Sequence, residues 1–261
     1  MGDYKNSNLI YSIIPARGGS KGVPGKNLKL LGGYPLIAYS IVASKLSKKI
    51  QRTIVSTDFE KIAEVAIRYG AEVPFLRPKE FARDDSPDIE FVLHALNWFF
   101  EKEGNIPNYL VHLRPTTPLR EPQIIDLAIE EICRRPEATS LRSGHPASES
   151  PLKWFLKDEK GYFKSLSPKY SMEECNLPRQ IFPTVYIPNG YVDVLKSSFV
   201  MTSKTLHGNK MIGFVTPVCH EVDTVEDFEY LEFILNKKGS FIWDFLKKNF
   251  PQEGRDDRVE V

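Results

Sequence analysis

The sequence has few cysteines and no long hydrophobic run. Its 261 residues include three cysteines, Cys133, Cys175 and Cys219. An odd number at wide spacing indicates neither a disulfide framework nor a zinc knuckle, so we expect reduced thiols in a cytoplasmic protein. No run of about 18 apolar residues occurs, and residues 1–8 lack the basic-then-apolar order of a signal peptide. We therefore expect no membrane partner.

The sequence also lacks an excess of charge of either sign. It has 35 Lys and Arg against 34 Asp and Glu, a formal net charge of +1. A dedicated nucleic-acid-binding protein needs a basic excess to displace counterions, so we expect no nucleic-acid partner. A local basic pocket for a small anion remains compatible with this balance. The apolar content of 41% and the length are typical of one large globular domain.

Short apolar runs alternate with helical patterns over the first 140 residues. The pattern predicts strands at residues 9–15, 53–56, 73–76, 109–113 and 138–141, and helices at residues 35–46, 59–69, 89–102 and 123–134. This alternation is typical of a three-layer, doubly wound α/β fold with a mostly parallel sheet. Ligands of such sheets bind beyond the carboxyl ends of the strands, so the residues that follow each strand are candidates for a site.

The alternation breaks in a proline-rich stretch at about residues 144–187. A hairpin is predicted at residues 153–165, turning near Lys160 and Gly161. We interpret the stretch as an inserted dimerisation arm; a long surface loop is the alternative. Strands are expected again at residues 191–195, 212–216 and 218–222, before a helix at residues 225–236 that Thr224 caps. We predict a single domain over residues 1–261 with a charged, disordered tail at residues 251–261.

A loop rich in glycine and basic residues follows the first predicted strand. Residues 15–27 read PARGGSKGVPGKN and contain four glycines. Glycines let backbone N–H groups approach an anion, and Arg17, Lys21 and Lys26 add charge-assisted donors. The Walker pattern does not fit, because Ser20 stands where it needs a glycine, and the dinucleotide-binding pattern is absent. The loop therefore predicts a phosphate-binding site of another kind; a flexible basic loop without a ligand is the alternative.

Six further short motifs follow this loop. They are IVSTD at residues 54–58, LRP at 76–78, LRPTTPLR at 113–120, PRQ at 178–180, PNG at 188–190 and EVDT at 221–224. In order and spacing, over about residues 9–236, the set resembles the CMP-N-acylneuraminate (CMP-sialic acid) synthetases, which are sugar-acid cytidylyltransferases. The resemblance implies that CTP and a nine-carbon keto sugar acid are the substrates and that Mg²⁺ assists. The anomeric hydroxyl would attack the α-phosphate and release pyrophosphate.

The resemblance also implies roles for individual residues. Catalytic roles are implied for Arg17, Lys21 and Asp223. Nucleotide-binding roles are implied for Ala16, Arg17, Gly18, Ser20, Lys21, Lys26, Asn27, Arg77 and Asp84, the last two near the cytosine. Sugar-binding roles are implied for Arg114, Thr116, Thr117, Arg120, Lys153, Arg179, Gln180 and Asn189. In a homodimer, Lys153 and Arg179 would reach the site of the neighbouring subunit. For Arg114 and Arg120, a structural ion pair is the alternative.

Glu221 and Asp223 are the candidate magnesium ligands. They stand two residues apart at the end of the strand predicted at residues 218–222, which would place both carboxylates on one face and His220 on the other. Carboxylate oxygens are suitable ligands for Mg²⁺. The alternative is an acidic cluster that favours the dipole of the following helix. Members of the family usually have Asp-x-Asp here, so the direct role of Glu221 stays open.

Two further departures from the family concern the sugar acid. The family commonly has glutamine at the position of Arg114 and a basic residue at the position of Ile187. We interpret the pair as a relocated positive charge and expect a nonulosonic acid other than N-acetylneuraminate, such as legionaminate. An Arg114→Gln/Ile187→Arg variant should then gain kcat/KM for N-acetylneuraminate.

Three other functions remain open at this point. The first is a synthetase that activates 3-deoxy-manno-octulosonate, and the second is a metal-dependent glycosyltransferase that uses a nucleotide-sugar. The third is a nucleotide-sensing module without catalysis.

His94 and His112 lie within predicted core elements and are expected to be structural.

Overall fold

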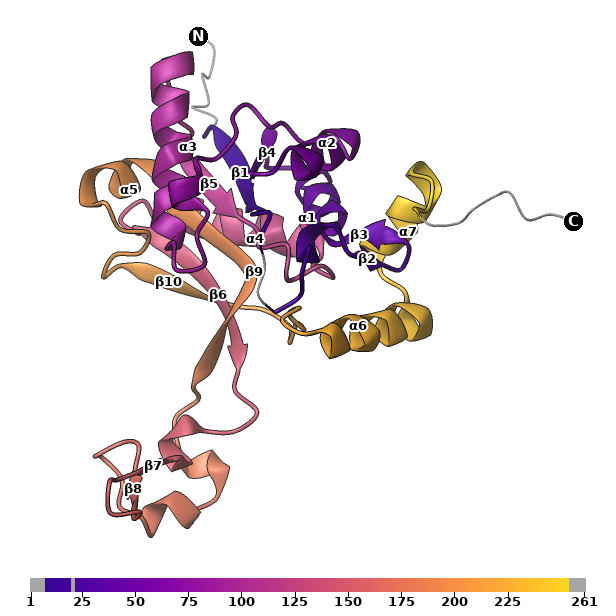
Figure 1. Cartoon of the computed structure of the whole chain (residues 1–261). Coiled ribbons are helices and arrows are strands. Elements are labelled where there is room, and N and C mark those ends of the chain that lie inside the picture. The colour runs from indigo at the N-terminus through magenta and orange to yellow at the C-terminus, as the bar shows by residue number, and fades with distance from the viewer. Residues whose placement is uncertain (1–7, 20–21, 254–261) are drawn as a thin grey trace, which may run out of the picture.

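A six-stranded sheet forms the centre of the computed structural model, which describes residues 8–19 and 22–253 (Figure 1). In spatial order its strands are β10 (Met211–Val215), β6 (Ser140–Pro146), β9 (Tyr186–Lys196), β5 (Tyr109–His112), β1 (Ile10–Pro15) and β4 (Arg52–Ser56). Strand β9 is antiparallel to β5 and β6, and the other pairings are parallel. The mostly parallel sheet is therefore confirmed. A short hairpin of β2 (Leu30–Leu31) and β3 (Tyr34–Pro35) lies outside it.

Two cores, one on each face of the sheet, confirm the three layers. One contains residues of α1 (Leu36–Lys45), α2 (Glu60–Arg68), α4 (Pro122–Cys133), α6 (Val225–Lys238) and α7 (Phe241–Asn249). The other contains residues of α3 (Asp88–Glu103) and α5 (Ser197–Ser203). Successive strand side chains point to opposite faces, so Ile13 packs in the α3 core and Ile14 in the α1 core.

Four expectations about the elements need correction. Residues 73–76 form no strand; isolated bridges occur only at Glu72 and Leu76, and Pro74 between them has no N–H to donate. Residues 218–222 are also irregular, because Val222 N donates to the carbonyl of Thr116 rather than to a strand. The strand expected at residues 138–141 starts later and extends to residue 146. Helices α5 and α7 were not predicted.

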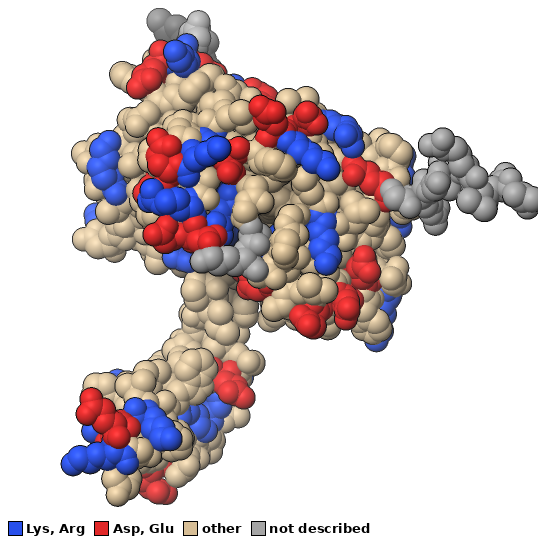
Figure 2. Space-filling model, viewed as in Figure 1, with Lys and Arg blue, Asp and Glu red and all other residues tan. Residues whose placement is uncertain are grey.

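Between β6 and β9 the chain leaves the sheet and forms an arm. Strands β6 and β9 continue past the sheet as a two-stranded stem, in which His145 pairs with Ile187. The stem carries a small unit with the hairpin of β7 (Phe155–Lys157) and β8 (Phe163–Ser165), and Gly161 takes a positive φ of 88° in its turn. Figure 1 shows the arm projecting away from the body, and the face of the stem seen in Figure 2 carries no charged side chain.

Helix α6 begins immediately after the acidic motif, as predicted. The Thr224 side chain accepts from Asp227 N, and the Asp227 carboxylate accepts from Asp223 N and Thr224 N. This capping box fixes the backbone that carries Asp223. Within the described part of the chain, no helix has the length and apolar character of a membrane span. Most of the tail expected to be disordered, residues 254–261, lies outside the described residues.

Candidate active site

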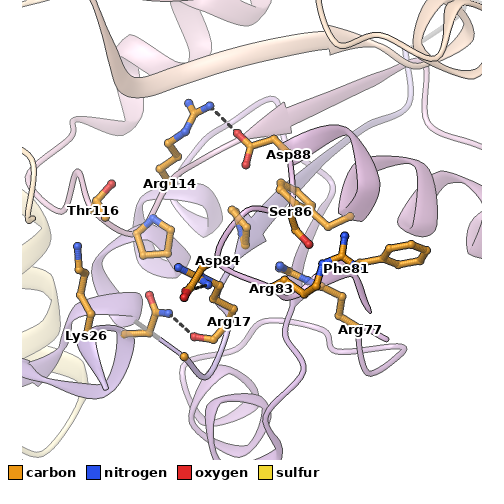
Figure 3. Close-up of a pocket in the computed structure, with 15 residues that line it drawn as sticks. Arg17, Lys26, Arg77, Phe81, Arg83, Asp84, Ser86, Asp88, Arg114 and Thr116 are labelled. Atoms are coloured by element: carbon orange, nitrogen blue, oxygen red, sulfur yellow. Dashed lines mark hydrogen bonds and ion pairs between the residues drawn. The ribbon is translucent and has the colours of Figure 1, made fainter. Parts of the chain in front are cut away.

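A cavity of about 260 Å³ lies at the carboxyl ends of β1 and β5 (Figure 3). Its walls come from the glycine-rich loop, from the connection between α2 and α3, from the first turn of α3, and from the segment after β5. It is lined by Pro15, Arg17, Gly19, Lys26, Asn27, Arg77, Phe81, Arg83, Asp84, Ser86, Asp88, Phe91, Arg114, Pro115 and Thr116. The location is where a doubly wound sheet is expected to bind a ligand.

The ends of the glycine-rich loop are held by hydrogen bonds to side chains. Gly18 N donates to Asp58 Oδ1 at 2.8 Å, and Asn27 Nδ2 donates to the carbonyl of Arg17 at 3.0 Å. Gly25 has a φ of 64°, a conformation that favours glycine, and it precedes the helical turn that begins at Lys26. The loop is thus anchored on both sides. The predicted roles of Ser20 and Lys21 lie outside the described residues.

The cavity is rich in cations that already have carboxylate partners. Arg17 Nη1 lies 2.5 Å from Asp84 Oδ1, and Arg83 Nε lies 3.3 Å from Asp85 Oδ1. Lys26 Nζ donates to the carbonyl of Val222 at 2.6 Å. The Arg17–Asp84 pair is partly exposed, so an anionic ligand can compete with the carboxylate for the guanidinium.

Arg77 forms part of the cavity wall and is almost fully buried. Its guanidinium donates to the Ser56 side chain at 3.0 Å and to the Ser56 carbonyl at 2.5 Å, and it lies over the ring of Phe91. Burial lowers the pKa of Arg77 to about 10, which still leaves it charged at neutral pH. Arg77 therefore links β4 to α3 at the edge of the cavity.

Arg114 forms the structural ion pairs that were the alternative to substrate binding. Its Nη1 lies 2.9 Å from Asp193 Oδ2, and its Nη2 lies 2.9 Å from Asp88 Oδ2. Asp193 is 1% exposed, whereas Asp88 lies in the cavity wall (Figure 3). Ile187 stands where the family commonly has a basic residue. It lies on the stem of the arm and does not line the cavity. The Arg114 charge is thus balanced within the chain.

Three of the predicted sugar-binding residues are buried beside the cavity rather than in its wall. Arg120 is 1% exposed and donates to Ser40 Oγ and to the carbonyls of Arg114 and Gly190. Asn189 accepts from Ser143 Oγ and donates to Thr216 Oγ1. Thr117, the third of these residues, is also buried. Arg120 is accordingly not half of an ion pair but a buried cation held by neutral oxygens.

The predicted residues of the arm lie in a different part of the molecule. Lys153 Nζ donates to the carbonyl of Leu177, and Arg179 Nη1 donates to the carbonyl of Ser148. Gln180 lines a shallow pocket of the arm with Arg179. Within one chain, none of these three lines the cavity of the body.

The two acidic candidates point in different directions. Glu221 Oε1 accepts a hydrogen bond from Gly190 N at 2.5 Å. The Asp223 side chain is 78% exposed, and its Oδ1 lies 3.5 Å from Lys26 Nζ. The expectation of a strand that presents both carboxylates on one face is wrong, because this segment is irregular. His220 contacts the hydroxyl of Tyr230.

Eight residues of the cavity wall were not predicted as site residues: Pro15, Gly19, Phe81, Arg83, Ser86, Asp88, Phe91 and Pro115. Pro15, Gly19 and Pro115 lie inside motifs that the sequence analysis singled out, whereas Phe81, Arg83 and Ser86 lie between α2 and α3, and Asp88 and Phe91 lie in α3. Asp88 is the first residue of α3, a position at which acidic residues favour the helix dipole for structural reasons alone. Only its contact with Arg114 indicates that it belongs to the site.

His112 should make the stability of the protein depend on pH. It is buried, and neither ring nitrogen has a hydrogen-bond partner among the described residues. Burial holds its pKa well below the ordinary value of 6.5, and Arg114 and Arg120 lower it further. Asp193 Oδ2 lies 4.0 Å from Nδ1, but Arg114 already neutralises that carboxylate.

Below pH 6.5 the unfolded chain therefore binds a proton that the folded chain does not. We expect His112 to reduce the free energy of unfolding by up to about 1.4 kcal/mol per pH unit as the pH falls below 6.5. Urea unfolding at pH 5.5, 6.0 and 7.5 measures this slope. A His112→Phe variant should lose this part of the slope, and an unchanged slope would contradict the assignment.

Comparisons with known proteins agree with this geometry. Residues 11–231 match the family described as "Cytidylyltransferase". A CMP-N,N'-diacetyllegionaminic acid synthase of Legionella pneumophila is 46% identical over 121 residues, which are 46% of this chain and 52%, about half, of that protein. A protein of the same name from Campylobacter jejuni is 30% identical over 90% of this chain and 99% of its own length.

A solved structure shares the fold at low identity. It is a CMP:2-keto-3-deoxy-manno-octonic acid synthetase complexed with CTP, and the superposition has a TM-score of 0.65 at 15% identity. The match covers 88% of this chain and 99% of that chain. The two chains thus share the same overall fold.

Proposed function

Because the chain belongs to the cytidylyltransferase family, we propose that it couples CTP to a nonulosonic acid and releases pyrophosphate. The observation that carries the proposal is the cavity at the carboxyl edge of the sheet, where Arg17, Lys26 and Arg83 converge. Phosphoryl transfer needs positioned positive charge more than covalent chemistry, and this cavity supplies it. The names of both legionaminic acid relatives support a nine-carbon sugar acid of that type as the substrate.

In the proposed reaction, the sugar hydroxyl oxygen forms a bond to the α-phosphorus while the bond from that phosphorus to the bridging oxygen breaks. Pyrophosphate leaves, and the hydroxyl proton passes to solvent. Arg17 and Lys26 would balance the charge that develops on the phosphates. Asp58 would not contact the substrate. Its carboxylate accepts a hydrogen bond from Gly18 N and would thereby position the loop that carries Arg17.

The residues near the cavity fit a divalent cation that is shared with phosphates. Mg²⁺ is commonly bound by one or two carboxylates together with substrate phosphates and water. Asp223 is an exposed carboxylate beside Lys26 and is suited to this role. No cluster of three or more His, Cys, Asp or Glu residues that could hold a metal without a substrate occurs in the described ranges. The cation would polarise the α-phosphate and stabilise the leaving pyrophosphate.

The proposed function is tested by pyrophosphate release from CTP with Mg²⁺ and a panel of sugar acids. The panel contains legionaminate, pseudaminate, N-acetylneuraminate, deaminated neuraminate and 3-deoxy-manno-octulosonate. Turnover with one nine-carbon acid is expected. Turnover with 3-deoxy-manno-octulosonate alone would instead support the sister activity, and the lack of both turnover and CTP binding would contradict the proposal.

Substitution of Asp84 should strengthen CTP binding. The Asp84 carboxylate occupies Arg17 in this structure, so a triphosphate must compete with it. An exposed ion pair of this kind is worth up to about 1 kcal/mol, so Asp84→Asn should lower the Kd for CTP by about two- to fivefold. Asp244→Asn, which removes an exposed carboxylate that pairs with Lys247 on α7 and does not line the cavity, is the control in calorimetric titrations and should leave the Kd unchanged. Weaker binding by Asp84→Asn would show instead that the carboxylate itself contacts the nucleotide.

The arm supports the proposal that the enzyme is a homodimer. Its exposed apolar side chains include Trp154, Phe155, Tyr162 and Phe163, and the two phenylalanines stack on each other. Apolar surface of this kind marks an interface, and pairing of two arms would bury it. Lys153 and Arg179 of the arm would then be available to the site of the second copy.

Removal of one arm aromatic should weaken this association. We expect Phe163→Ser to shift the mass in light scattering from about twice to about once the chain mass of 29.8 kDa at micromolar concentration. Leu127→Ser, an equally exposed apolar residue on α4, is the control and should leave the mass unchanged. A monomeric wild-type chain would contradict the dimer.

We also propose that the enzyme acts in the cytoplasm. Cys133, Cys175 and Cys219 are all free in the structure, and Cys175 is buried. Reduced cysteines are typical of proteins in a reducing compartment.

A further inference from the structure

The backbone of β9 is interrupted beside the acidic motif. Asp193 pairs with both β5 and β6, but the register with β6 then shifts so that residues 189–192 lie opposite Ser143 alone. The peptide of Gly190 is buried in this bulge and takes part in no strand pairing with the described residues. A buried peptide N–H or C=O without a partner is costly, so other groups must satisfy both.

Two charged side chains supply the missing partners. Glu221 Oε1 accepts from Gly190 N at 2.5 Å, and Arg120 Nη2 donates to the Gly190 carbonyl at 2.9 Å. Arg120 is 1% exposed, and burial lowers the pKa of its guanidinium to about 10, which leaves it charged at neutral pH. The two side chains therefore hold one peptide group from both ends.

The same contacts position the rest of the acidic segment. Val222 N donates to the Thr116 carbonyl at 2.8 Å, and Lys26 Nζ donates to the Val222 carbonyl at 2.6 Å. Gly22 lies so close to the Asp223 carbonyl that an added Cβ would approach it to 2.5 Å. The backbone is held by three neighbouring segments, while the Asp223 side chain itself stays exposed.

We propose that Glu221 is a positioning residue that fastens the acidic segment to β9 through Gly190, and that Asp223 alone of the pair offers its carboxylate to the cation. The inference rests on the proposed function and departs from the two-ligand arrangement that the motif implies. One oxygen of Glu221 already accepts the hydrogen bond from Gly190 N. A carboxylate that is held in this way is a poorer ligand for a cation than the exposed carboxylate of Asp223.

The first test compares glutamine with alanine at position 221. The readout is the apparent Kd of Mn²⁺ in the enzyme–CTP complex, measured by electron paramagnetic resonance with CTP alone as the blank. A glutamine oxygen can still accept from Gly190 N, so Glu221→Gln should stay within about threefold of the wild type. Glu221→Ala should weaken Mn²⁺ binding about tenfold, as expected when a residue that orients a ligand is lost. Asp223→Asn should weaken it more.

The contrast between the variants separates the possible roles. Equal losses in Glu221→Gln and Glu221→Ala would show that Glu221 ligates the cation and would overturn the proposal. An unchanged Kd in Glu221→Ala would overturn it as well, because the contact would then be merely structural. Glu229→Ala, which removes an exposed carboxylate from α6, is the control and should match the wild type.

A second measurement tests the fastening itself without CTP, metal or sugar acid. The Gly190 amide proton should exchange with solvent at least about tenfold faster in Glu221→Ala than in the wild type or Glu221→Gln. Equal protection in all three proteins would overturn the proposed contact. Failure of the wild type to bind Mn²⁺ and CTP or to release pyrophosphate would instead count against the proposed function.

Discussion

Asp223→Asn should reduce kcat/KM for pyrophosphate release at least about 100-fold, the usual cost of losing one group that stabilises charge in the transition state. The Asp223 side chain is exposed, and its Oδ1 lies 3.5 Å from Lys26 Nζ. The backbone that precedes it is held in place, because Lys26 Nζ donates to the carbonyl of Val222. Asparagine keeps the shape but removes the negative charge that a divalent cation needs. Steady-state kinetics with the substrate identified by the panel measures the effect.

A matched control separates this loss from a general effect of removing an aspartate. Asp244→Asn removes a similarly exposed carboxylate from α7, where it pairs with Lys247, and should leave kcat/KM within about twofold. Asp223→Asn should also keep the unfolding midpoint of the wild type, because its side chain is not packed. Full activity in Asp223→Asn would contradict both the cation role and the further inference.

Arg120→Met should lower the free energy of unfolding by about 3–5 kcal/mol. The substitution removes donors from Ser40 Oγ and from the carbonyls of Arg114 and Gly190, all in the interior. Methionine fills much of the volume, so the loss reports the polar contacts more than a cavity.

Urea unfolding with a surface control measures this loss. Arg134→Met, on an exposed turn of α4, removes only surface pairs with Glu130 and Glu131 and should change stability by less than about 0.5 kcal/mol. If Arg120→Met lowered the free energy of unfolding as little as Arg134→Met does, Arg120 would not stabilise the segments that contain Ser40, Arg114 and Gly190. Its buried position would then require another explanation.

The overall architecture and the glycine-rich loop at the edge of the cavity were predictable from local sequence. Strands such as β1 and β4 are buried along nearly their whole length because both faces of the sheet are covered, and helical patterns separate them in the sequence. Glycines and cations after a buried strand indicate an anion site without any knowledge of the fold, since the backbone and the charges belong to one loop. Thr224 was also predictable, because a helix cap is a local interaction.

The roles of the charged residues around that loop were decided by the tertiary structure. Arg114 and Arg120 stand in one motif, yet Arg114 faces two carboxylates from α3 and β9, and Arg120 faces three neutral oxygens. Glu221 and Asp223 are two residues apart, yet one faces the interrupted strand and the other faces solvent.

The physical reason is that a charged side chain takes its role from the partners that surround it. For Arg114, Arg120 and Glu221, these partners come from segments that are distant in the sequence. The sequence by itself determined the fold class, the loop and the family resemblance. Only the folded chain determined which of its charges are available to a ligand and which hold the site together.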